Sequence, residues 1–367
     1  MSLHDDPDDD DDDDRRQSRA RLPILRIFFW VDQTFTTFFK NLTILTSTRS
    51  TSGPSSPSST SLSIIFSLNR ATTSNPSPTG AVGSPQDANH IQARRPEISE
   101  TFQPPHRFRE FDLHDRVYII TGGGRGLGLA MAEALLEAGA KVYCLDRLES
   151  PHPDYLLAKQ HAETHYGGSL HYNRIDIRDS DAVHTLFASI ASQNGRLDGL
   201  IAAAGINHLS PALSHTPEKL HEVMDINYNG VFHSATAAAR QMFNYNQKGS
   251  ILLVASMSGL IANKGMTSPV YNSSKAAVIQ LGRNLAMEWG RYGIRVNSLC
   301  PGHIVTPMVE QVFARDPGSR AVWESENMLG RLASPEEFRG AALFALSDAS
   351  SFMTGSSLLI DGGHTAW

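Results

Sequence analysis

The sequence predicts a single α/β domain built on a doubly wound, parallel β-sheet, and three observations predict it. From about Phe111 onward, short apolar stretches alternate with Ala/Leu-rich stretches of helical pattern. The apolar stretches, such as "RVYII", "GLIAAA" and "SILLVAS", are continuous, as expected of strands that helices cover on both faces. A glycine-rich turn separates the first strand from the first helix. Strands that alternate with helices in this way pair in parallel through right-handed crossovers.

Seven strands are expected in this domain, which we assign to residues 106–367. They lie near residues 117–121, 141–146, 170–175, 198–203, 250–255, 294–299 and 357–360, with helical patterns between them. The chain shows no internal repeat and no second folded unit. One seven-stranded sheet therefore accounts for the whole predicted domain.

Residues 1–105 differ in composition and are predicted to form a disordered, low-complexity tail. A run of aspartates from Asp8 is followed by an Arg-containing patch and a Ser/Thr/Pro-rich stretch. Such a segment buries too little apolar surface to offset the entropy lost on ordering. The apolar stretch "LPILRIFFWVDQTFTTFFKNLTIL" is interrupted by Arg26, Asp32 and Lys40, so no membrane span is predicted.

The tail also bears on the compartment of the protein. The stretch "RRQSRARLPILR" has the basic character of a mitochondrial presequence, but the acidic run precedes it. The same acidic run gives the wrong charge for a secretory signal. A cytoplasmic location is therefore expected, with mitochondrial targeting as the alternative.

Charge, cysteine and histidine content exclude several classes of function. The net charge of -6 arises partly from the N-terminal acidic run, and no basic stripe predicts nucleic-acid binding. Cys144 and Cys300 lie far apart in apolar stretches, which predicts reduced core residues and no disulfide. The fifteen histidines show no HExxH or Cys/His spacing. No metal site is therefore predicted.

The run "TGGGRGLG" after the first strand predicts a phosphate-binding turn. Its glycines stand where the strand becomes a helix. Glycine at such a boundary lets the backbone approach a pyrophosphate, whose charge then lies at the helix N-terminus, where unpaired amides point outward. The residues assigned to a dinucleotide here are Gly122, Arg125, Gly126, Leu127 and Gly128.

An acidic residue at the end of the second strand, "KVYCLD", supports this interpretation. Asp146 stands where a carboxylate accepts hydrogen bonds from both hydroxyls of the adenosine ribose. A 2′-phosphate would face a like charge there, so NAD is expected rather than NADP. Arg125 and Arg147 can each pair with a phosphate, so NADP stays open.

The stretch "SPVYNSSKAAVIQL" supplies an acid/base pair. Tyr271 and Lys275 are four residues apart on a predicted helix and therefore share one face. A neighbouring cation stabilises a phenolate, by about 1.4 kcal/mol for each pH unit by which the pKa falls. Ser256 follows the strand "SILLVA" directly, at the strand end that faces the ligand crevice of a parallel sheet. Ser258 is the competing hydroxyl.

With these motifs in this order, the chain from about Phe111 to the C-terminus resembles the classical branch of the short-chain dehydrogenase/reductase family. The resemblance implies a Rossmann fold and a site for the adenine ring at Asp176 and Ile177 of "RIDIRD", although Asp176 can alternatively cap the next helix. It also implies a cofactor contact at Ala204 and Gly205. The family usually shows NNAG there, whereas this chain has alanines in place of the asparagine that braces the central strands.

The resemblance further implies the catalytic roles. Ser256 orients the substrate carbonyl, Tyr271 exchanges the proton, and Lys275 also holds the nicotinamide ribose. Asn227 of "MDINYNGVF" holds a water in the proton relay, or is simply a satisfied polar residue.

Beyond the sixth strand, "VNSLCPGHIVTPM" resembles the family's Pro-Gly turn. Pro301 and Gly302 then carry the chain over the nicotinamide, Ile304 offers its amide to the carboxamide, and Thr306 reaches the pyrophosphate. Residues 305–328 resemble the variable substrate lid.

These observations predict an NAD(P)-dependent oxidoreductase that interconverts a secondary alcohol and a ketone by hydride transfer. The stretches "VYCLDR" and "SMSGLIANKG" resemble fungal polyol and ketose reductases such as arabinitol dehydrogenase and sorbose reductase. The alternative is a catalytically silent, nucleotide-sensing or scaffold protein of the same fold. The resemblance also implies a homodimer or homotetramer formed through helices near 218–243 and 270–290. The small residues of these helices suit close contacts between subunits or, equally, packing on the sheet.

Overall fold

The computed structural model describes residues 108–367. The predictions for the acidic run, the apolar stretch and the rest of the N-terminal tail therefore lie outside the described residues. Within the described part, no helix has both the length and the apolar character needed to cross a membrane.

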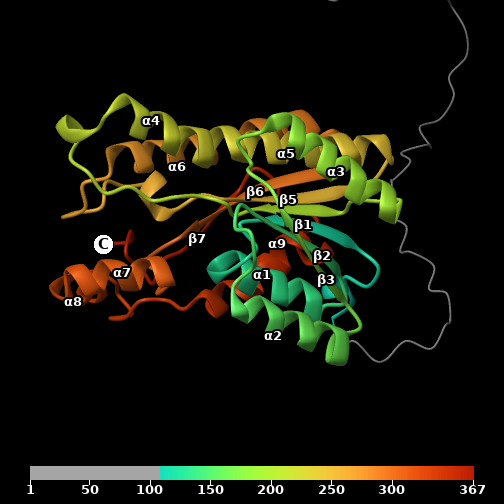
Figure 1. The fold of residues 1–367 in the computed structure, drawn as a ribbon, viewed down its shortest axis with the longest axis horizontal. Coiled ribbons are helices and arrows are strands. Elements are labelled where there is room, and N and C mark those ends of the chain that lie inside the picture. Colours follow the sequence, from blue (N-terminus) through green and yellow to red (C-terminus); the bar gives the residue numbers. More distant parts are fainter. Residues whose placement is uncertain (1–107) are drawn as a thin grey trace, which may run out of the picture. The chain divides into compact units, whose positions relative to one another are not determined.

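The core of the described part is one parallel sheet of seven strands in the order β3-β2-β1-β4-β5-β6-β7 (Figure 1). Each strand pairs with its neighbours in parallel. The strands are β1 (Val117–Thr121), β2 (Lys141–Asp146), β3 (Ser169–Arg174), β4 (Gly199–Ala202), β5 (Gly249–Val254), β6 (Ile294–Pro301) and β7 (Ser357–Ile360). The predicted doubly wound sheet is confirmed.

The predicted strand positions agree with the observed ones, and the largest difference has a physical reason. β6 continues to Pro301 because β7 pairs with it through Cys300 and Pro301. A prediction from local apolar pattern ends the strand earlier, since a proline is not expected inside one. Pro301 is tolerated because it is the last residue of the strand.

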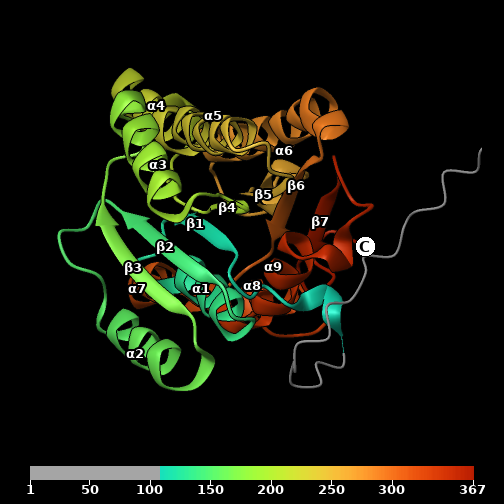
Figure 2. The same ribbon diagram turned by 90° about the vertical axis from the view of Figure 1, so that its right-hand side faces the viewer.

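Helices cover both faces of the sheet, in two layers on opposite sides (Figures 1 and 2). α3, α5 and α6 pack on one face around residues such as Phe187 and Ile251, with α4 beside them. α1, α2 and α9 pack on the other around Leu135 and Phe338. The helices are α1 (Gly126–Glu137), α2 (Pro153–His161), α3 (Ser180–Asn194), α4 (Pro217–Met224), α5 (Gly230–Asn244), α6 (Pro269–Trp289), α7 (Pro307–Arg315), α8 (Gly318–Ser325) and α9 (Arg339–Leu346).

Two alternatives from the sequence are decided by these helices. Asp179, and not Asp176, caps α3, because its carboxylate accepts the Ala182 amide at 3.0 Å. The small residues of α5, including Ala235 and Ala238, are fully buried and pack in the core of the domain. In α5, small residues therefore serve packing on the sheet.

Both cysteines are buried and free, as the sequence predicts. Burial raises the pKa of the Cys144 thiol and raises that of Cys300 to about 11. Neither thiol is therefore an activated nucleophile.

The strand order reverses between β1 and β4, and this reversal positions the site. β1 pairs with β2 on one side and with β4 on the other, while the connections before and after it run over opposite faces. In such sheets a crevice opens outside the carboxyl ends of the strands at this point. The residues that follow β1 and β4 are the glycine turn at Gly122 and the segment Ala203–Gly205.

Candidate active site

The glycine turn after β1 leads directly into α1. An added Cβ on Gly128 would lie 2.2 Å from the carbonyl oxygen of Gly122, so only glycine lets the helix start this close to the strand. Gly126 has φ +58°, and an added Cβ there would meet nothing within 4 Å. The N-terminal amides of α1 therefore border open space, as a bound pyrophosphate requires.

A groove beside this turn collects most of the predicted cofactor residues. It is lined by the ends of β1, β2 and β4 and by the segment after β3. The predicted residues that line it are Gly122, Arg125, Gly126, Leu127, Gly128, Asp146, Asp176, Ile177, Ala204, Gly205 and Thr306. The groove thus joins the glycine turn to the residues predicted to hold the adenosine half of a dinucleotide.

Asp146 is held at the end of β2 by backbone amides. Its carboxylate accepts the Gly124 amide at 3.2 Å and the Leu148 amide at 3.3 Å. These bonds fix the carboxylate in the groove and leave it capacity to accept ribose hydroxyls, because a carboxylate offers about four acceptor sites. Arg125 and Arg147 line the same groove.

Asp176 lies in the groove but already has a partner there. The Nε of Arg178 donates to both of its carboxylate oxygens at 3.0 Å. The side-chain hydrogen bond from Arg178 lowers the pKa of Asp176. Arg178, which sequence reasoning did not single out, therefore occupies the carboxylate that the resemblance assigns to adenine.

Ser256, Tyr271 and Lys275 come together where β5 ends and α6 begins. Ser256 is buried two residues after β5, and its hydroxyl accepts the Ser258 amide at 3.1 Å. The ammonium of Lys275 lies 5.8 Å from the centre of the Tyr271 ring and donates to the Val254 carbonyl at 2.9 Å. Burial raises the pKa of Tyr271, and the neighbouring Ser256 side chain acts against that rise.

The competing hydroxyl, Ser258, has a different partner. Its hydroxyl accepts the amide nitrogen of Asn263 at 2.6 Å. Of the two serines, only Ser256 interacts with the phenol of Tyr271. The arrangement therefore favours Ser256 as the orienting residue.

Lys275 joins this cluster to the groove. An added Cβ on Gly205, which lines the groove, would lie 3.4 Å from the ammonium nitrogen of Lys275 and 3.3 Å from Oδ1 of Asn227. Lys275 is 5% exposed, and burial lowers its pKa from 10.5 to about 8. Glycine at this position lets a ligand in the groove approach the lysine.

Asn227 lies in a π-helical turn, Asp225–Asn229, between α4 and α5. Its amide nitrogen donates to the Ile206 carbonyl and to the Ser274 hydroxyl, and its Oδ1 accepts the Ile206 amide at 2.8 Å. The side chain thus braces the loop after β4 against α6. Its side-chain amide is satisfied within the protein, and a π-helical turn inside a helix is frequent at functional sites.

Of the four cofactor residues predicted from the end of β6 onward, one lines the groove and three do not. Thr306 lines the groove and also caps α7, accepting the Val309 amide at 3.3 Å. Pro301, Gly302 and Ile304 do not line the groove. Ile304 instead pairs with Ala333 through an isolated β-bridge.

The missing asparagine of the family motif does not break the central strands. β4 pairs with β1 and β5 up to Ala202. The Ala204 amide donates to the Thr121 hydroxyl at 3.4 Å, which ties the following loop to β1.

Comparison with known proteins identifies the family of this chain. Residues 122–365 match the family model described as Enoyl-(Acyl carrier protein) reductase. The short chain dehydrogenases/reductase notP' of Aspergillus versicolor is 43% identical over 262 residues, which cover 70% of this chain and 89% of that protein. The chain belongs to the short-chain dehydrogenase/reductase family.

Two further relatives of this short-chain dehydrogenase/reductase carry more specific names. The ribulose-forming D-arabinitol 2-dehydrogenase of Scheffersomyces stipitis is 38% identical over 70% of this chain and 96% of that protein. A gluconate 5-dehydrogenase from Burkholderia cenocepacia, solved in complex with NADP and tartrate, is 31% identical with a TM-score of 0.65. It covers 71% of this chain and 100% of its own. The resemblance to arabinitol dehydrogenase is confirmed.

Membership of this family makes the chain an NAD(P)-dependent oxidoreductase that acts on CH–OH groups. The catalytically silent alternative finds no support, because the candidate serine, tyrosine and lysine are present and adjacent.

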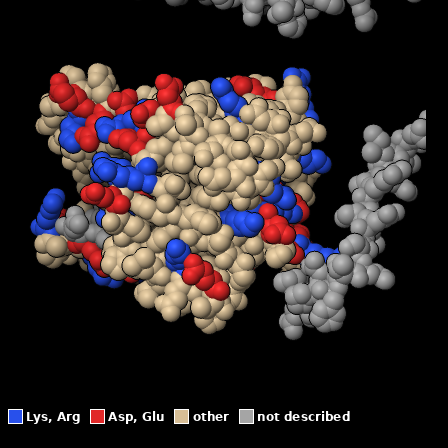
Figure 3. All heavy atoms as spheres, turned by 45° about the vertical axis from the view of Figure 1, so that its right-hand side comes forward, with Lys and Arg blue, Asp and Glu red and all other residues tan. Residues whose placement is uncertain are grey.

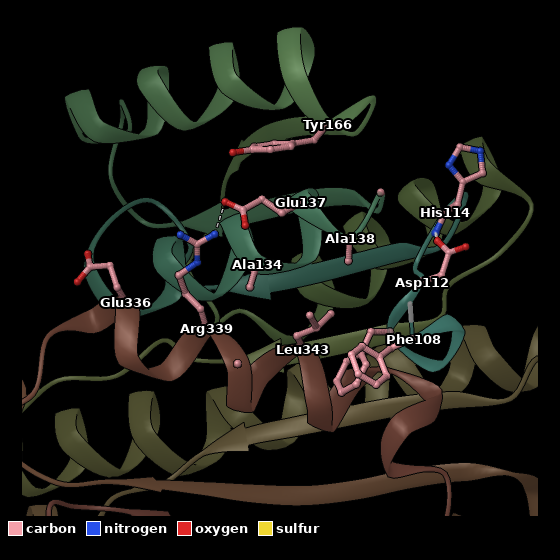
Figure 4. Close-up of a pocket in the computed structure, with 13 residues that line it drawn as sticks. Phe108, Asp112, His114, Ala134, Glu137, Ala138, Tyr166, Glu336, Arg339 and Leu343 are labelled. Atoms are coloured by element: carbon pink, nitrogen blue, oxygen red, sulfur yellow. Dashed lines mark hydrogen bonds and ion pairs between the residues drawn. The ribbon is translucent and has the colours of Figure 1, made fainter. Parts of the chain in front are cut away.

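A second cavity of this short-chain dehydrogenase/reductase, of about 950 Å³, contains no predicted site residue. It lies between α1, α9 and the start of the described chain, where Arg339 forms an ion pair with Glu137 (Figure 4). The catalytic cluster therefore lies outside this cavity, and the predicted residues that line the groove, rather than cavity size, identify the site.

Proposed function

We propose that this short-chain dehydrogenase/reductase interconverts a secondary alcohol of a polyol and the corresponding ketose, with NAD(H) as the preferred cofactor. The observation that carries the proposal is the placement of Lys275 between the Tyr271 phenol and the edge of the cofactor groove at Gly205. The bound nicotinamide supplies or accepts the hydride.

The protein's own residues move and orient the proton. Tyr271 donates a proton to the substrate oxygen in reduction and accepts it in oxidation. Ser256 holds the same oxygen, because its hydroxyl is buried beside the phenol. Lys275 stabilises the phenolate, and a neighbouring cation is the standard means of lowering a phenol pKa.

A polar substrate is supported by an unpaired group next to the serines. Asn263 is 6% exposed, and its Oδ1 has no hydrogen-bond partner among the described residues. Its amide nitrogen is bound to Ser258, so the oxygen is fixed in place. A buried acceptor left unpaired costs roughly 1–3 kcal/mol, which a substrate hydroxyl relieves on binding. The name of the Scheffersomyces stipitis relative supports the same substrate class.

NAD is supported by the position of Asp146, and NADP is the alternative. The carboxylate faces the groove and is not paired with an arginine in the described part of the chain. A 2′-phosphate would meet this negative charge. Arg125 and Arg147 line the groove as well, and they are the residues that would favour NADP.

The decisive experiment replaces Tyr271 with phenylalanine, which removes the hydroxyl and keeps the ring. With NADH and a panel of ketoses, we expect kcat to fall by about 10²- to 10⁴-fold, the range for loss of a general acid or base. The Kd for NADH should change by less than about twofold, because the phenol does not line the groove. Tyr292→Phe, on the exposed turn after α6, is the matched control and should retain activity.

Two outcomes separate the parts of this proposal. Full activity of Tyr271→Phe would refute the catalytic assignment. Turnover of simple secondary alcohols but of no polyol would refute the substrate class while leaving the catalytic assignment intact.

We also propose that the protein is a homodimer or homotetramer in the cytoplasm. One face of the domain carries a broad area free of Lys, Arg, Asp and Glu side chains (Figure 3). On α5 and α6, Phe232 is 40% exposed, Phe243 43% and Met287 72%. Phe243 and Met287 line one hollow at the ends of these helices, and contiguous exposed apolar surface is a mark of protein interfaces.

A further inference from the structure

Three side chains from distant parts of the sequence meet beside the lid. His303 follows β6, Glu326 follows α8, and His364 lies in the C-terminal turn after β7. Each offers one ligand atom, and these atoms all lie within 4.8 Å of one another. The three residues are too far apart along the chain to form a recognisable metal motif, which is why the sequence predicts no such site.

The imidazole of His303 is buried, held in place and unpaired. The residue is 9% exposed, and its Nε2 has no hydrogen-bond partner among the described residues. Its ring stacks on Trp323 of α8, with centroids 4.4 Å apart and planes 12° apart. An unpaired buried ring nitrogen costs free energy, so this nitrogen requires a partner that the described residues do not provide.

The imidazole of His364 is oriented by an outer hydrogen bond. Its Nδ1 lies 3.2 Å from Oδ1 of Asn327, whose amide nitrogen donates to the Arg331 carbonyl at 2.8 Å. Since the amide oxygen therefore faces the ring, Nδ1 carries the proton and Nε2 keeps its lone pair. Histidine ligands of metals are typically held in this way by a hydrogen bond to the other nitrogen.

The C-terminal turn that presents His364 is itself fixed. Asp361 accepts the amide and the hydroxyl of Thr365 at 2.9 and 2.8 Å, and the Gly363 amide at 3.0 Å. Burial acts to raise the pKa of Asp361, but these hydrogen bonds lower it overall. The turn is thus built around an ionised carboxylate that holds the backbone on both sides of His364.

Glu326 adds the negative charge to this group. The nearest arginines on either side of Glu326 in the sequence form ion pairs with other residues, Arg320 with Glu324 and Arg331 with Glu337. Among the described residues, Glu326 forms no ion pair with a lysine or arginine. Two imidazoles and one carboxylate are the ligand set of a zinc site with one open position.

We propose that His303, Glu326 and His364 form a binding site for a divalent transition-metal ion, and that Zn²⁺ fits the ligand set best. Ligand bonds to zinc are about 2.0–2.2 Å long, so the three donors must close around the ion. Glu326 is only partly buried and can make that movement. The site is not catalytic, because none of its residues lines the cofactor groove.

The position of the site gives the ion a structural role. It joins the segment that follows Pro301 and Gly302, the end of α8 in the lid, and the C-terminal turn, which Figure 1 shows on the same side of the molecule as α7 and α8. His303 also contacts Trp323, so the ion would hold the lid against the sheet. This inference stands independently of the proposed substrate.

The test is calorimetric titration of the full, tag-free chain, stripped with a chelator, with ZnCl₂ and with CoCl₂. We expect one ion per chain, a raised melting temperature, and the absorption bands of low-symmetry Co²⁺. His364→Ala and Glu326→Gln should each weaken binding by at least about 100-fold, and Asn327→Ala by about 10- to 100-fold as an outer-sphere change. The matched control is His221→Ala, on the exposed face of α4, which should bind as the parent does.

Folding and binding can be separated in this test. Glu326→Gln removes only a partly exposed charge, so it should keep the circular dichroism spectrum and NADH affinity of the parent even if His364→Ala does not fold. Absence of stoichiometric binding at micromolar ion, or equal binding by the parent and Glu326→Gln, would overturn the proposal. Neither result would affect the assignment of Tyr271.

Discussion

The buried ammonium of Lys275 should lower the free energy of unfolding, and the substitution Lys275→Met measures by how much. Methionine keeps the length and apolar character of the lysine stem but removes the charge. Lys275 is 5% exposed, and burial lowers its pKa from 10.5 to about 8. The substitution should therefore stabilise the cofactor-free fold at neutral pH while it abolishes most of the activity, a trade-off that active sites commonly show.

The size of the effect follows from the two pKa values. The difference between 10.5 and about 8 corresponds to about 3 kcal/mol against the charged form in the folded state. Removing the lysine also leaves the Val254 carbonyl without its 2.9 Å donor, which costs about 1–3 kcal/mol. The net gain in the free energy of unfolding at pH 7 is therefore at most about 2 kcal/mol.

The pH dependence gives the sharper signature, and its sign follows from proton binding. Between pH 8 and pH 10.5 the unfolded lysine binds more protons than the folded one, so the stability of the parent rises with pH in that window. Lys275→Met has no such group. The advantage of the variant should thus be largest below pH 8 and should largely disappear by pH 10.

Urea unfolding of parent and variant at equal protein concentration, at pH 7 and pH 10, measures both quantities. Lys264→Met, at an exposed position of the loop before α6, is the control and should change the unfolding free energy little at either pH. A Lys275→Met variant that is less stable than the parent at pH 7, or a difference that does not change with pH, would refute the buried-ammonium reasoning.

Two further predictions test the cofactor and the assembly. Asp146→Ala removes the carboxylate from the end of β2 and should raise the Kd for NADH by about 10- to 100-fold, as expected when hydrogen bonds to a charged group are lost. The Kd for NADPH should rise less. An unchanged preference for NADH over NADPH would contradict the role of Asp146. Sedimentation of the parent should show a dimer or tetramer that Met287→Lys weakens, and a parent that sediments only as a monomer would contradict the proposed interface.

Most of the fold could be predicted because its signals are local. A continuous apolar strand such as Val117–Thr121 is buried along its whole length, so its sequence carries no ambiguity about which face is covered. The turn glycines are required by contacts a few residues apart, such as that between Gly128 and the Gly122 carbonyl. Features set by pairing between distant segments were harder to predict, as the longer β6 shows, because β7 decides where it ends.

The parts of the candidate site that lie on a single helix could be predicted from the sequence. The parts that are brought together from several loops could not. Tyr271 and Lys275 share one helix face, so their spacing predicts their adjacency. Arg178 in the groove, the unpaired Asn263 and the cluster of His303 with His364 gave no such signal. Each depends on loops whose positions the sheet fixes but the local sequence does not.

The directions of the two shifted pKa values bear on how the site works. Burial raises the pKa of Tyr271 and lowers that of Lys275, so each group is pushed toward its neutral form. A neutral phenol is the form that donates a proton, and reduction of a ketone needs only that form. Oxidation needs the phenolate, which the burial of Tyr271 disfavours and which additional positive charge near the phenol would stabilise. Since the groove adjoins Lys275 at Gly205, a cationic ligand bound there would supply it, and proton abstraction would therefore follow binding of the oxidised cofactor.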